Sequence, residues 1–365
     1  MYKMSFLIIT LLFGLTILAQ ELPWTPSATL IQQIYNNIES QFYDKNTNLY
    51  YSSANNGQNM YSYLWATSAL FQAFEEMQNC SLPRNNFLLE KMFETIQHYY
   101  DGVENTSNVN YGGYDSYVVK FGGGQRYYDD NEWTALDMLD AYKITNNSEF
   151  LKTAEKIFNF VQNGQDDKLG GGIYWAENGN SKNTCSNGPA IVLALKLYKI
   201  THKDMYFNFA KKIYAWTNKN LLSPENLYWD HIDIDGHVNK AEFTYNTGIM
   251  IQANVLFYEI TNDVNYLNEA KKLAEESLKH FASNGNFPYW DDGSFWFNAV
   301  LLRGYQNLYR VDKSDGYIYI YTFDDWMSRV YKSLLDAKSL LYQSGLLEIC
   351  SRLYMIEHLY IQVLL

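Results

Sequence analysis

The sequence predicts an all-α protein in which about twelve helices alternate between buried inner positions and amphipathic outer positions. Three observations predict it. A similar segment recurs along the chain, helices that are apolar on nearly every side alternate with amphipathic ones, and long links rich in glycine and aromatic residues precede only the apolar helices. Such pairs close into an (α/α)6 barrel, with an open helical solenoid as the alternative. We expect the closed ring, because the apolar helices require burial on every side.

The recurring segment reads aromatic–Lys/Glu–Ile–Thr, then a short polar turn, an aromatic residue and an amphipathic run. It occurs as AYKITNNSEFLKTAEKIF from Ala141, LYKITHKDMYFNFAKKIY from Leu197 and FYEITNDVNYLNEAKKLA from Phe257. A weaker fourth copy, LYRVDKSDGYIYI, contains Tyr309. Repetition of this kind indicates one helix pair used several times.

Each predicted pair consists of an outer helix followed by an inner helix. The pairs are 29–43 with 59–78, 87–101 with 128–145, 149–163 with 184–200, 204–221 with 243–260, 264–282 with 295–311, and 324–343 with 345–362. The long links all lead into inner helices, so we expect them to gather on one face beside the inner-helix N-termini. These N-termini carry partial positive charge, and the sequence therefore predicts the functional site on this face, among long site-face loops.

Composition limits the partners that the protein can bind. Aromatic residues make up 17% of the chain, with 33 Tyr, 20 Phe and 9 Trp, more than a core alone requires. Tyr and Trp combine a flat apolar face with a polar edge, which suits contact with sugars or bases. The formal charge of −12 argues against nucleic acid, because phosphate binding needs a concentrated positive surface. A neutral carbohydrate is therefore the expected partner.

The N-terminus has the pattern of a secretory signal peptide over residues 1–19. Lys3 supplies the positive charge, an apolar run of 13 residues extends from Phe6 to Leu18, and Ala19 offers a small residue for cleavage. That run is shorter than the about 20 residues that span a bilayer, and no later stretch suits a membrane span or lipid anchor. We therefore expect a secreted or cell-envelope protein.

The cysteines favour neither a disulfide framework nor a metal site. Cys80, Cys185 and Cys350 allow at most one internal disulfide, and nothing in the sequence selects the pair. The chain has no CxxC or HxxxH spacing that would indicate structural zinc. We expect no metal, no cofactor and a monomer.

Two adjacent carboxylates, Asp129 and Asp130, open the second inner helix within the stretch RYYDDNEWTALDMLDAY, 126–142. One interpretation is structural, because Asp is favoured at a helix N-cap and in the first turn. The other is catalytic. Only this inner helix begins with two carboxylates flanked by Tyr-Tyr and Asn-x-Trp. The preceding loop contains GGG at 122–124, where the absence of side chains lets the backbone approach closely. Two carboxyls held close together acquire different pKa values, as acid–base work on a glycosidic bond requires.

The spacing of this pair bears on stereochemistry. Adjacent residues at a helix start hold their carboxyls a few ångströms apart, which fits the separation of about 5–5.5 Å of a retaining glycosidase rather than the wider one of an inverting enzyme.

Three stretches carry a family resemblance. YYDDNEW (127–133), SKNTCSNG (181–188) and EFTYNTGIMI (242–251) resemble the signature stretches of glycoside hydrolase family 76, the endo-α-1,6-mannanases, and GSFWFNAVLLRGYQNLY (293–309) is a weaker match. The resemblance implies an (α/α)6 barrel and retaining, metal-free hydrolysis of α-1,6-mannosidic bonds. It also implies Asp129 as nucleophile and Asp130 as general acid/base, within a single catalytic domain over 20–365.

The candidate substrate-binding residues lie at the starts of inner helices or in the site-face loops. Those at or near helix starts are Tyr128, Asn131, Trp133, Asn187, Tyr245 and Asn246. Amides can donate to and accept from sugar hydroxyls. Trp175, Trp229 and Trp290 recur at equivalent points of three loops, where they either stack on a sugar ring or fill space between loops.

Other acidic residues compete with the Asp pair for a role. The run DHIDIDG (230–236) lacks the ligand spacing of a calcium loop and is expected to form a hairpin, from which Asp230 or Asp233 could reach a sugar. Asp291–Asp292 lies on a site-face loop, Asp166–Asp167 is expected in solvent, and Asp324–Asp325 is expected to cap the eleventh helix.

The sequence thus predicts a secreted endo-glycosidase acting on α-mannan polysaccharide or oligosaccharide. Two alternatives remain open: a mannan or cell-wall transglycosylase that uses the same Asp pair, and a carbohydrate-binding barrel without catalytic activity.

Overall fold

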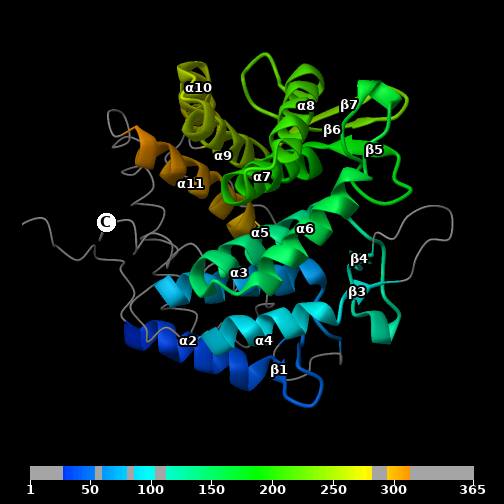
Figure 1. Cartoon of the computed structure of the whole chain (residues 1–365), viewed down its shortest axis with the longest axis vertical. Coiled ribbons are helices and arrows are strands. Elements are labelled where there is room, and N and C mark those ends of the chain that lie inside the picture. Colours follow the sequence, from blue (N-terminus) through cyan, green and yellow to red (C-terminus); the bar gives the residue numbers. More distant parts are fainter. Residues whose placement is uncertain (1–27, 54–59, 80–85, 103–111, 282–293, 313–365) are drawn as a thin grey trace, which may run out of the picture.

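The computed structural model describes residues 28–53, 60–79, 86–102, 112–281 and 294–312 (Figure 1). Several expectations concern residues outside these ranges: the signal peptide over 1–19, the sixth helix pair over 324–343 and 345–362, the remainder of the fourth repeat copy, and the loop that contains Trp290 and Asp291–Asp292.

The described part of the chain contains five outer and five inner helices in strict alternation. The outer helices are α2 (Ala28–Gln41), α4 (Asn86–Gln97), α6 (Ser148–Gln162), α8 (Asp204–Leu221) and α10 (Val264–Phe281). The inner helices are α3 (Leu64–Asn79), α5 (Tyr128–Thr145), α7 (Thr184–Thr201), α9 (Thr244–Thr261) and α11 (Ser294–Val311). Each helix predicted within these ranges is confirmed, and most bounds agree to within one or two residues.

Two predicted bounds differ because strand pairing takes residues from the helices. The helix expected over 59–78 begins only at Leu64, since Tyr61 pairs with Tyr51 in an antiparallel bridge. The helix expected over 87–101 ends at Gln97, since β3 (Tyr100–Asp101) pairs with β4 (Gly113–Tyr114).

The inner helices form a closed ring. Neighbours α3 and α5, α5 and α7, α7 and α9, and α9 and α11 pack against each other. Across the remaining gap, Trp65 of α3 meets Trp296 of α11 edge-on with ring centroids 5.4 Å apart. Midway along the same two helices, Nη2 of Arg303 donates to Oε1 of Gln72 at 3.2 Å. An open solenoid would keep the first and last of these helices apart, so the barrel is confirmed.

The repeated Ile-Thr segment ends three inner helices in the same way. The residue after the Thr adopts the left-handed conformation, with φ of 56° or 57°, and its N–H donates to the carbonyl of the repeat's tyrosine four residues earlier. The pairs are Asn146 with Tyr142 (2.7 Å), His202 with Tyr198 (2.8 Å) and Asn262 with Tyr258 (2.8 Å). This closure satisfies a terminal carbonyl and turns the chain at once into the next outer helix.

Helices α9 and α11 approach closely enough to require glycine. A Cβ added at Gly248 would lie 2.4 Å from Cα of Leu301, and one added at Gly304 would lie 2.7 Å from the carbonyl oxygen of Gly248. Both contacts involve main chain, which cannot move aside, so larger residues would force these helices apart.

The strands lie at the end of the barrel where the inner helices begin (Figure 1). The largest sheet in the described residues is antiparallel and has the order β5 (Ser181–Asn183), β6 (Trp229–Asp233), β7 (Val238–Glu242). Strands β6 and β7 form the hairpin expected over 230–236. A smaller hairpin joins β1 (Tyr43–Asp44) to β2 (Leu49–Tyr50). Within the described ranges, no helix has the length and apolar character needed to cross a membrane.

Candidate active site

A cavity of about 760 Å³ opens among the site-face loops at the N-terminal ends of the inner helices. Its lining is largely aromatic on one side and polar on the other. The lining residues are Tyr63, Trp65, Ser116, Tyr127, Asp129, Asp130, Trp133, Trp175, Asn180, Ser181, Asn183, Cys185, Asp230, His231, Asp233, Phe243, Tyr245, Trp296 and Phe297. The sequence placed the site on this face, and the cavity lies there.

Asp129 and Asp130 occupy the first turn of α5, but neither is its N-cap. Tyr127 is the cap residue, with an extended backbone and no side-chain capping bond. Both carboxyls are half-buried and line the cavity. They therefore benefit from the positive end of the helix while facing the space that a substrate would fill.

Asp129 is surrounded by hydrogen-bond donors. Nε1 of Trp175 donates to Oδ2 of Asp129 at 3.1 Å, and the main-chain N–H of Asp130 donates to Oδ1 at 3.1 Å. The buried thiol of Cys185 also contacts this carboxyl. Burial raises the pKa of Asp129 to about 6, and these three hydrogen bonds oppose the rise because they stabilise the carboxylate.

Asp130 has a different environment. Burial raises the pKa of Asp130 well above its usual value, and the neighbouring charge of Asp129 raises it further. Among the described residues, no donor reaches the Asp130 carboxyl. Asp129 therefore ionises before Asp130, and between the two pKa values the cavity presents one carboxylate beside one carboxylic acid.

A third acid, Glu132, lies on α5 one turn beyond the pair. Its side chain is fully buried, and both carboxyl oxygens are without a hydrogen-bond partner among the described residues. Burial and the charge of Asp129 raise the pKa of Glu132 well above its usual value. Burial and the charge of Asp129 thus both favour the protonated form of Glu132.

Main-chain bonds fix Trp175 over the Asp pair. The N–H of Tyr128 donates to the carbonyl of Trp175 at 2.9 Å, and the N–H of Trp175 donates to the carbonyl of Ser181 at 3.0 Å. The ring of Tyr127 lies 4.8 Å from that of Trp175. The loop is thus joined both to α5 and to β5, yet the indole remains 42% exposed, with room for a ligand.

Aromatic residues of several inner helices form the apolar wall of the cavity. Trp133 meets Trp296 edge-on with centroids 4.7 Å apart, and Tyr245 lies 4.2 Å from Phe297. Trp133 is only 3% exposed, so it supports the wall more than it presents a free face.

Strand β6 contributes the polar side. Nδ1 of His231 lies 2.8 Å from Oδ2 of Asp230, and its Nε2 lies 3.6 Å from Oδ1 of Asp233. All three side chains line the cavity. Carboxylates and an imidazole in this arrangement can accept from and donate to sugar hydroxyls.

Of the predicted binding residues, Trp133, Trp175 and Tyr245 line the cavity, and five others do not. The ring of Tyr128 stacks on Phe160, with centroids 4.9 Å apart. The ammonium nitrogen of Lys240 lies over the Trp229 ring, 4.9 Å from the ring centroid. The remaining three are Asn131, Asn187 and Asn246. Trp290 lies outside the described residues.

Asn131 and Asn187 hold the site-face loops in place. Oδ1 of Asn131 accepts from the N–H of Tyr114 at 2.8 Å, and its Nδ2 donates to the carbonyls of Tyr114 (2.9 Å) and Tyr127 (2.8 Å). Asn187 makes the same pattern with Ile173 and Asn183. Both side chains are fully buried, so their amides serve the main chain and position the loops.

Asn246 is also fully buried, and neither atom of its amide has a hydrogen-bond partner among the described residues.

The repeat predicts two cavity residues that the motifs alone did not single out, Cys185 and Trp65, because they are equivalent to Asp129 and Tyr245, which the motifs did identify. Asp129, Cys185 and Tyr245 are each the second residue of their inner helix, and each stands at the same distance before the repeat's tyrosine. They meet in the structure, since the thiol of Cys185 contacts both the Asp129 carboxyl and the Tyr245 hydroxyl. Trp65 is the second residue of α3 and also lines the cavity.

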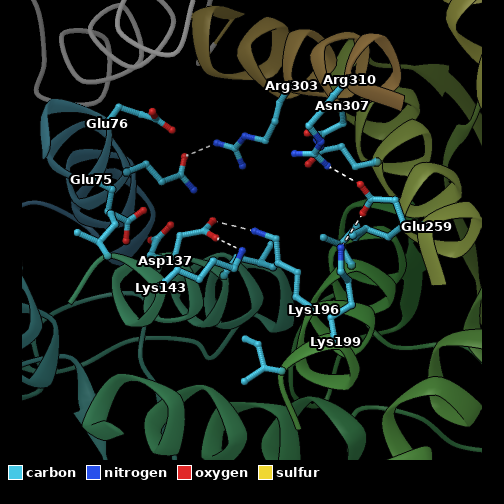
Figure 2. Close-up of a pocket in the computed structure, with 18 residues that line it drawn as sticks. Glu75, Glu76, Asp137, Lys143, Lys196, Lys199, Glu259, Arg303, Asn307 and Arg310 are labelled. Atoms are coloured by element: carbon cyan, nitrogen blue, oxygen red, sulfur yellow. Dashed lines mark hydrogen bonds and ion pairs between the residues drawn. The ribbon is translucent and has the colours of Figure 1, made fainter. Parts of the chain in front are cut away.

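The described residues also enclose a cavity of about 530 Å³ at the opposite end of the barrel (Figure 2). Charged side chains of α3, α5, α7, α9 and α11 line it, as Figure 2 shows for the labelled residues. Asp140 pairs with Lys143 (2.8 Å) and Lys196 (2.7 Å), and Glu259 pairs with Lys199 (2.7 Å) and Arg310 (2.9 Å). The pair of Asp140 with Lys143 lies within α5, and the other three pairs link neighbouring inner helices. All lie toward the negative C-terminal ends of these helices, where lysine and arginine are favourable.

Among the described residues, no three His, Cys, Asp or Glu side chains are grouped in a way that could hold a metal ion.

Comparison with known proteins identifies relatives in fungi. The chain is 28% identical over 204 residues to the meiotically up-regulated gene 191 protein of Schizosaccharomyces pombe, covering 48% of this chain and 46% of that protein. It is 28% identical over 148 residues to the mannan endo-1,6-alpha-mannosidase DCW1 of Saccharomyces cerevisiae, covering 37% of this chain and 33% of that protein. The matched part thus spans less than half the length of either relative.

Solved structures share the whole fold. A family 76 α-mannanase of Bacteroides thetaiotaomicron superposes with a TM-score of 0.78 at 24% identity, covering 92% of this chain and 96% of that one. An α-1,6-mannanase of Salegentibacter sp., in complex with α-1,6-mannotriose, superposes with a TM-score of 0.70 at 23% identity, covering 92% of this chain and 99% of that one. That molecule is described as an inactive variant in which two consecutive aspartates are replaced by asparagine.

The match to a family model has the widest coverage in sequence. The model of glycosyl hydrolase family 76 matches residues 29–292, a range that contains the Asp pair, its Trp175 donor and β5 to β7. The chain belongs to glycosyl hydrolase family 76.

Proposed function

We propose that this protein is a retaining endo-glycosidase that hydrolyses α-1,6-mannosidic linkages in mannan. The observation that carries the proposal is the unequal environment of two adjacent carboxyls in one cavity. Asp129 receives hydrogen bonds from Trp175 and from the main chain, whereas the pKa of Asp130 is raised further by the charge of Asp129. A stabilised carboxylate beside a protonated acid is what double displacement requires.

In the first step, Asp129 acts as the nucleophile. Its carboxylate oxygen attacks the anomeric carbon as the bond to the glycosidic oxygen breaks, and Asp130 transfers its proton to that departing oxygen. The products are a glycosyl ester on Asp129, a free sugar hydroxyl on the released fragment, and an ionised Asp130.

In the second step, Asp130 acts as the base. Its carboxylate removes a proton from a water molecule, which attacks the anomeric carbon and displaces the Asp129 carboxylate. The released sugar keeps the α-configuration after two inversions, and Asp130 regains its proton.

Two further aromatic side chains are proposed to contact the mannan chain, and a third supports them. Trp175 and Tyr245 offer aromatic faces at the cavity and Trp133 supports the same wall, in keeping with the amphipathic character of sugar rings. We also propose that Asp230 and Asp233 bind sugar hydroxyls.

The relatives support the substrate class. One is named a mannan endo-1,6-alpha-mannosidase. The inactive Salegentibacter variant lacks two consecutive aspartates and is bound to α-1,6-mannotriose. A secreted or cell-envelope location, with cleavage after residue 19, is part of the same proposal, since mannan is an extracellular polymer.

The test is digestion of linear α-1,6-mannan by the full chain, followed by sizing of the products and anomer analysis by proton NMR. We expect shorter α-anomeric oligosaccharides, and losses of at least about 10³-fold in Asp129→Asn and Asp130→Asn with unchanged circular dichroism. Asp167→Asn is the matched control, because Asp167 belongs to another Asp–Asp pair and is exposed. Full activity of either active-site variant would overturn the mechanism.

The products also separate the alternatives. Longer glycans formed in the presence of acceptor mannosides would identify a transglycosylase that uses the same pair. Binding to mannan without turnover would identify a carbohydrate-binding barrel.

A further inference from the structure

A row of aromatic side chains leads away from the cavity at Tyr63. We call it the aromatic ledge, and its members are Tyr63, Tyr117, Tyr61, Tyr51 and Phe121. It begins at Tyr63, which lines the cavity and is 50% exposed. The ring of Tyr117 lies 5.2 Å from that of Tyr63, and the Tyr117 hydroxyl accepts the main-chain N–H of Tyr61 at 3.1 Å.

The outer part of the aromatic ledge is a stack of three rings. Tyr61 lies between Tyr51, with centroids 4.9 Å apart and planes inclined by 14°, and Phe121, with centroids 5.1 Å apart and planes inclined by 28°. Phe121 ends the stack and is 47% exposed. A large apolar ring is thus held at the surface in continuity with the cavity.

Hydrogen bonds fix the stack before any ligand arrives. Oδ2 of Asp44 accepts from the hydroxyls of both Tyr51 (3.1 Å) and Tyr61 (2.9 Å). These bonds set the orientation of both rings, so a ligand that stacks on the ledge need not order them.

The GGG sequence at 122–124 holds Phe121 at the surface. Phe121 is the last residue of the 3₁₀ helix Val119–Phe121, and Gly122 reverses the chain with φ of 113°. A Cβ at Gly123 would lie 2.3 Å from Oδ2 of Asp115, the oxygen that accepts the N–H of Gly124 at 3.2 Å. The glycines therefore let the loop fold back onto Asp115, and Phe121, which directly precedes them, is left at the surface.

We propose that the aromatic ledge binds a neutral polysaccharide chain where it continues beyond the cavity, so that the protein grips a polymer more tightly than a short oligosaccharide. Pyranose rings present C–H faces that stack on aromatic faces, and the tyrosine hydroxyls can hydrogen-bond to sugar hydroxyls. The proposal rests on the proposed function for the identity of the polymer, but not for the existence of the binding surface.

Kinetics on substrates of two lengths test it. We expect Phe121→Ala to leave kcat/KM for α-1,6-mannotetraose unchanged and to raise KM for long α-1,6-mannan about fivefold, with kcat retained. Phe121→Trp keeps a ring and should restore the wild-type KM. Phe87→Ala is the matched control, because Phe87 is 68% exposed in the first turn of α4, at the end of the barrel away from the cavity.

A binding arm separates this inference from the proposed function. The full chain carrying Asp129→Asn, with and without Phe121→Ala, is mixed with insoluble α-mannan, β-glucan or xylan. The amount of protein that each polysaccharide removes from solution measures binding. If the wild type digests mannan and Phe121→Ala has the same KM for the polymer as the wild type, the proposed role of the aromatic ledge is overturned and the proposed function stands. Absence of mannan turnover, with Phe121-dependent binding to another of these polymers, overturns the function and supports the ledge. A Phe121-dependent change in oligomeric state without polysaccharide binding also overturns the ledge, because its occupant is then a second copy of the chain.

Discussion

The indole N–H of Trp175 donates to Oδ2 of Asp129 at 3.1 Å, across 46 residues of sequence. The bond joins a site-face loop to the first turn of α5. It also makes the two carboxyls unequal, since it stabilises charge on Asp129 and not on Asp130. A hydrogen bond to a charged group contributes about 1.5–3 kcal/mol, enough to decide which of two neighbouring acids ionises first.

Replacing Trp175 by Phe should therefore weaken catalysis in a pH-dependent manner. The variant keeps an aromatic ring but removes the donor, so the pKa of Asp129 should rise and the acidic limb of kcat/KM should move to higher pH by about one pH unit. At pH 6 we expect a loss of about fivefold, which shrinks toward pH 7.5. The measurement is the pH profile of mannan hydrolysis.

Trp229→Phe is the matched control for that experiment. Trp229 stands at the equivalent point of another loop, but its ring packs under Lys240 and does not line the cavity. Its profile should match the wild type. An equal displacement in both variants would contradict the role given to the Trp175 donor.

The wild-type pH profile should be bell-shaped. Activity should rise with pH through about 6 as Asp129 loses its proton, since burial raises the pKa of that carboxyl to about 6. It should fall at higher pH as Asp130, whose pKa is raised well above its usual value, loses its own. With a dinitrophenyl α-mannoside, whose leaving group needs no protonation, the alkaline limb of the first step should disappear. A persistent limb would contradict the assignment of Asp130 as the acid.

The sequence predicted the helices well because the repeat encodes their ends. The Thr of each Ile-Thr turn bonds back to the helix, and the next residue closes it in the left-handed conformation. These are local interactions, and local interactions are visible in a sequence. The Asp pair was located for the same reason, since the start of an inner helix fixes the face on which it lies.

The roles of the asparagines depended on register, which the motifs did not reveal. Asn131 and Asn187 are the fourth residues of α5 and α7, whereas Asn246 is the third residue of α9. One residue turns a side chain by about 100° around a helix. The fourth residue of α9 is Thr247, and its hydroxyl accepts the N–H of Tyr228 at 3.3 Å. Counting residues back from Tyr142, Tyr198 and Tyr258 would have separated Asn131 and Asn187 from Asn246.

Trp175 and Trp229 could not be distinguished from sequence. They lie at equivalent points of their loops, but Trp229 begins β6, whose pairing with β7 has a bulge between Trp229 and His231. The bulge interrupts the alternation of side chains along the strand, so His231 and Asp233 line the cavity and Trp229 does not. It is a feature of the strand pairing, which the loop sequence does not reveal.

The hydrogen bonds that buried Asn131 makes to the main chain predict that its replacement destabilises the fold more than replacement of Asn246. Asn131→Leu leaves the N–H of Tyr114 and the carbonyls of Tyr114 and Tyr127 without their side-chain partner. Its free energy of unfolding should fall by about 2–4 kcal/mol. Asn246→Leu removes an amide with no partner among the described residues and should cost less than about 1 kcal/mol. Urea unfolding followed by circular dichroism measures both. Equal losses of unfolding free energy would contradict the role of Asn131 in holding the site-face loops.

The charged cavity at the other end of the barrel predicts opposite effects of pH for two aspartates of one helix. Burial raises the pKa of Asp137 to about 8, although hydrogen bonds from Ser68 and Gln72 oppose the rise. Burial would also raise the pKa of Asp140, but Lys143 and Lys196 outweigh it and lower that pKa below its usual value. Folding therefore shifts the pKa values of these two carboxyls in opposite directions from their values in the unfolded chain.

Between about pH 4 and pH 8, folded Asp137 keeps a proton that the unfolded chain releases, so its carboxyl weakens the fold increasingly as pH rises. Asp137→Asn cannot ionise, and its melting temperature should exceed that of the wild type by a margin that grows from pH 5 to pH 8. Folded Asp140 stays ionised below the pH at which the unfolded chain takes up a proton, so its contribution is full at neutral pH and is lost on acidification. Asp140→Asn should thus melt below the wild type at pH 7, with a difference that narrows toward pH 4. Thermal unfolding at several pH values measures both, and parallel responses would show that the ion pairs with Lys143 and Lys196 do not govern this end of the barrel.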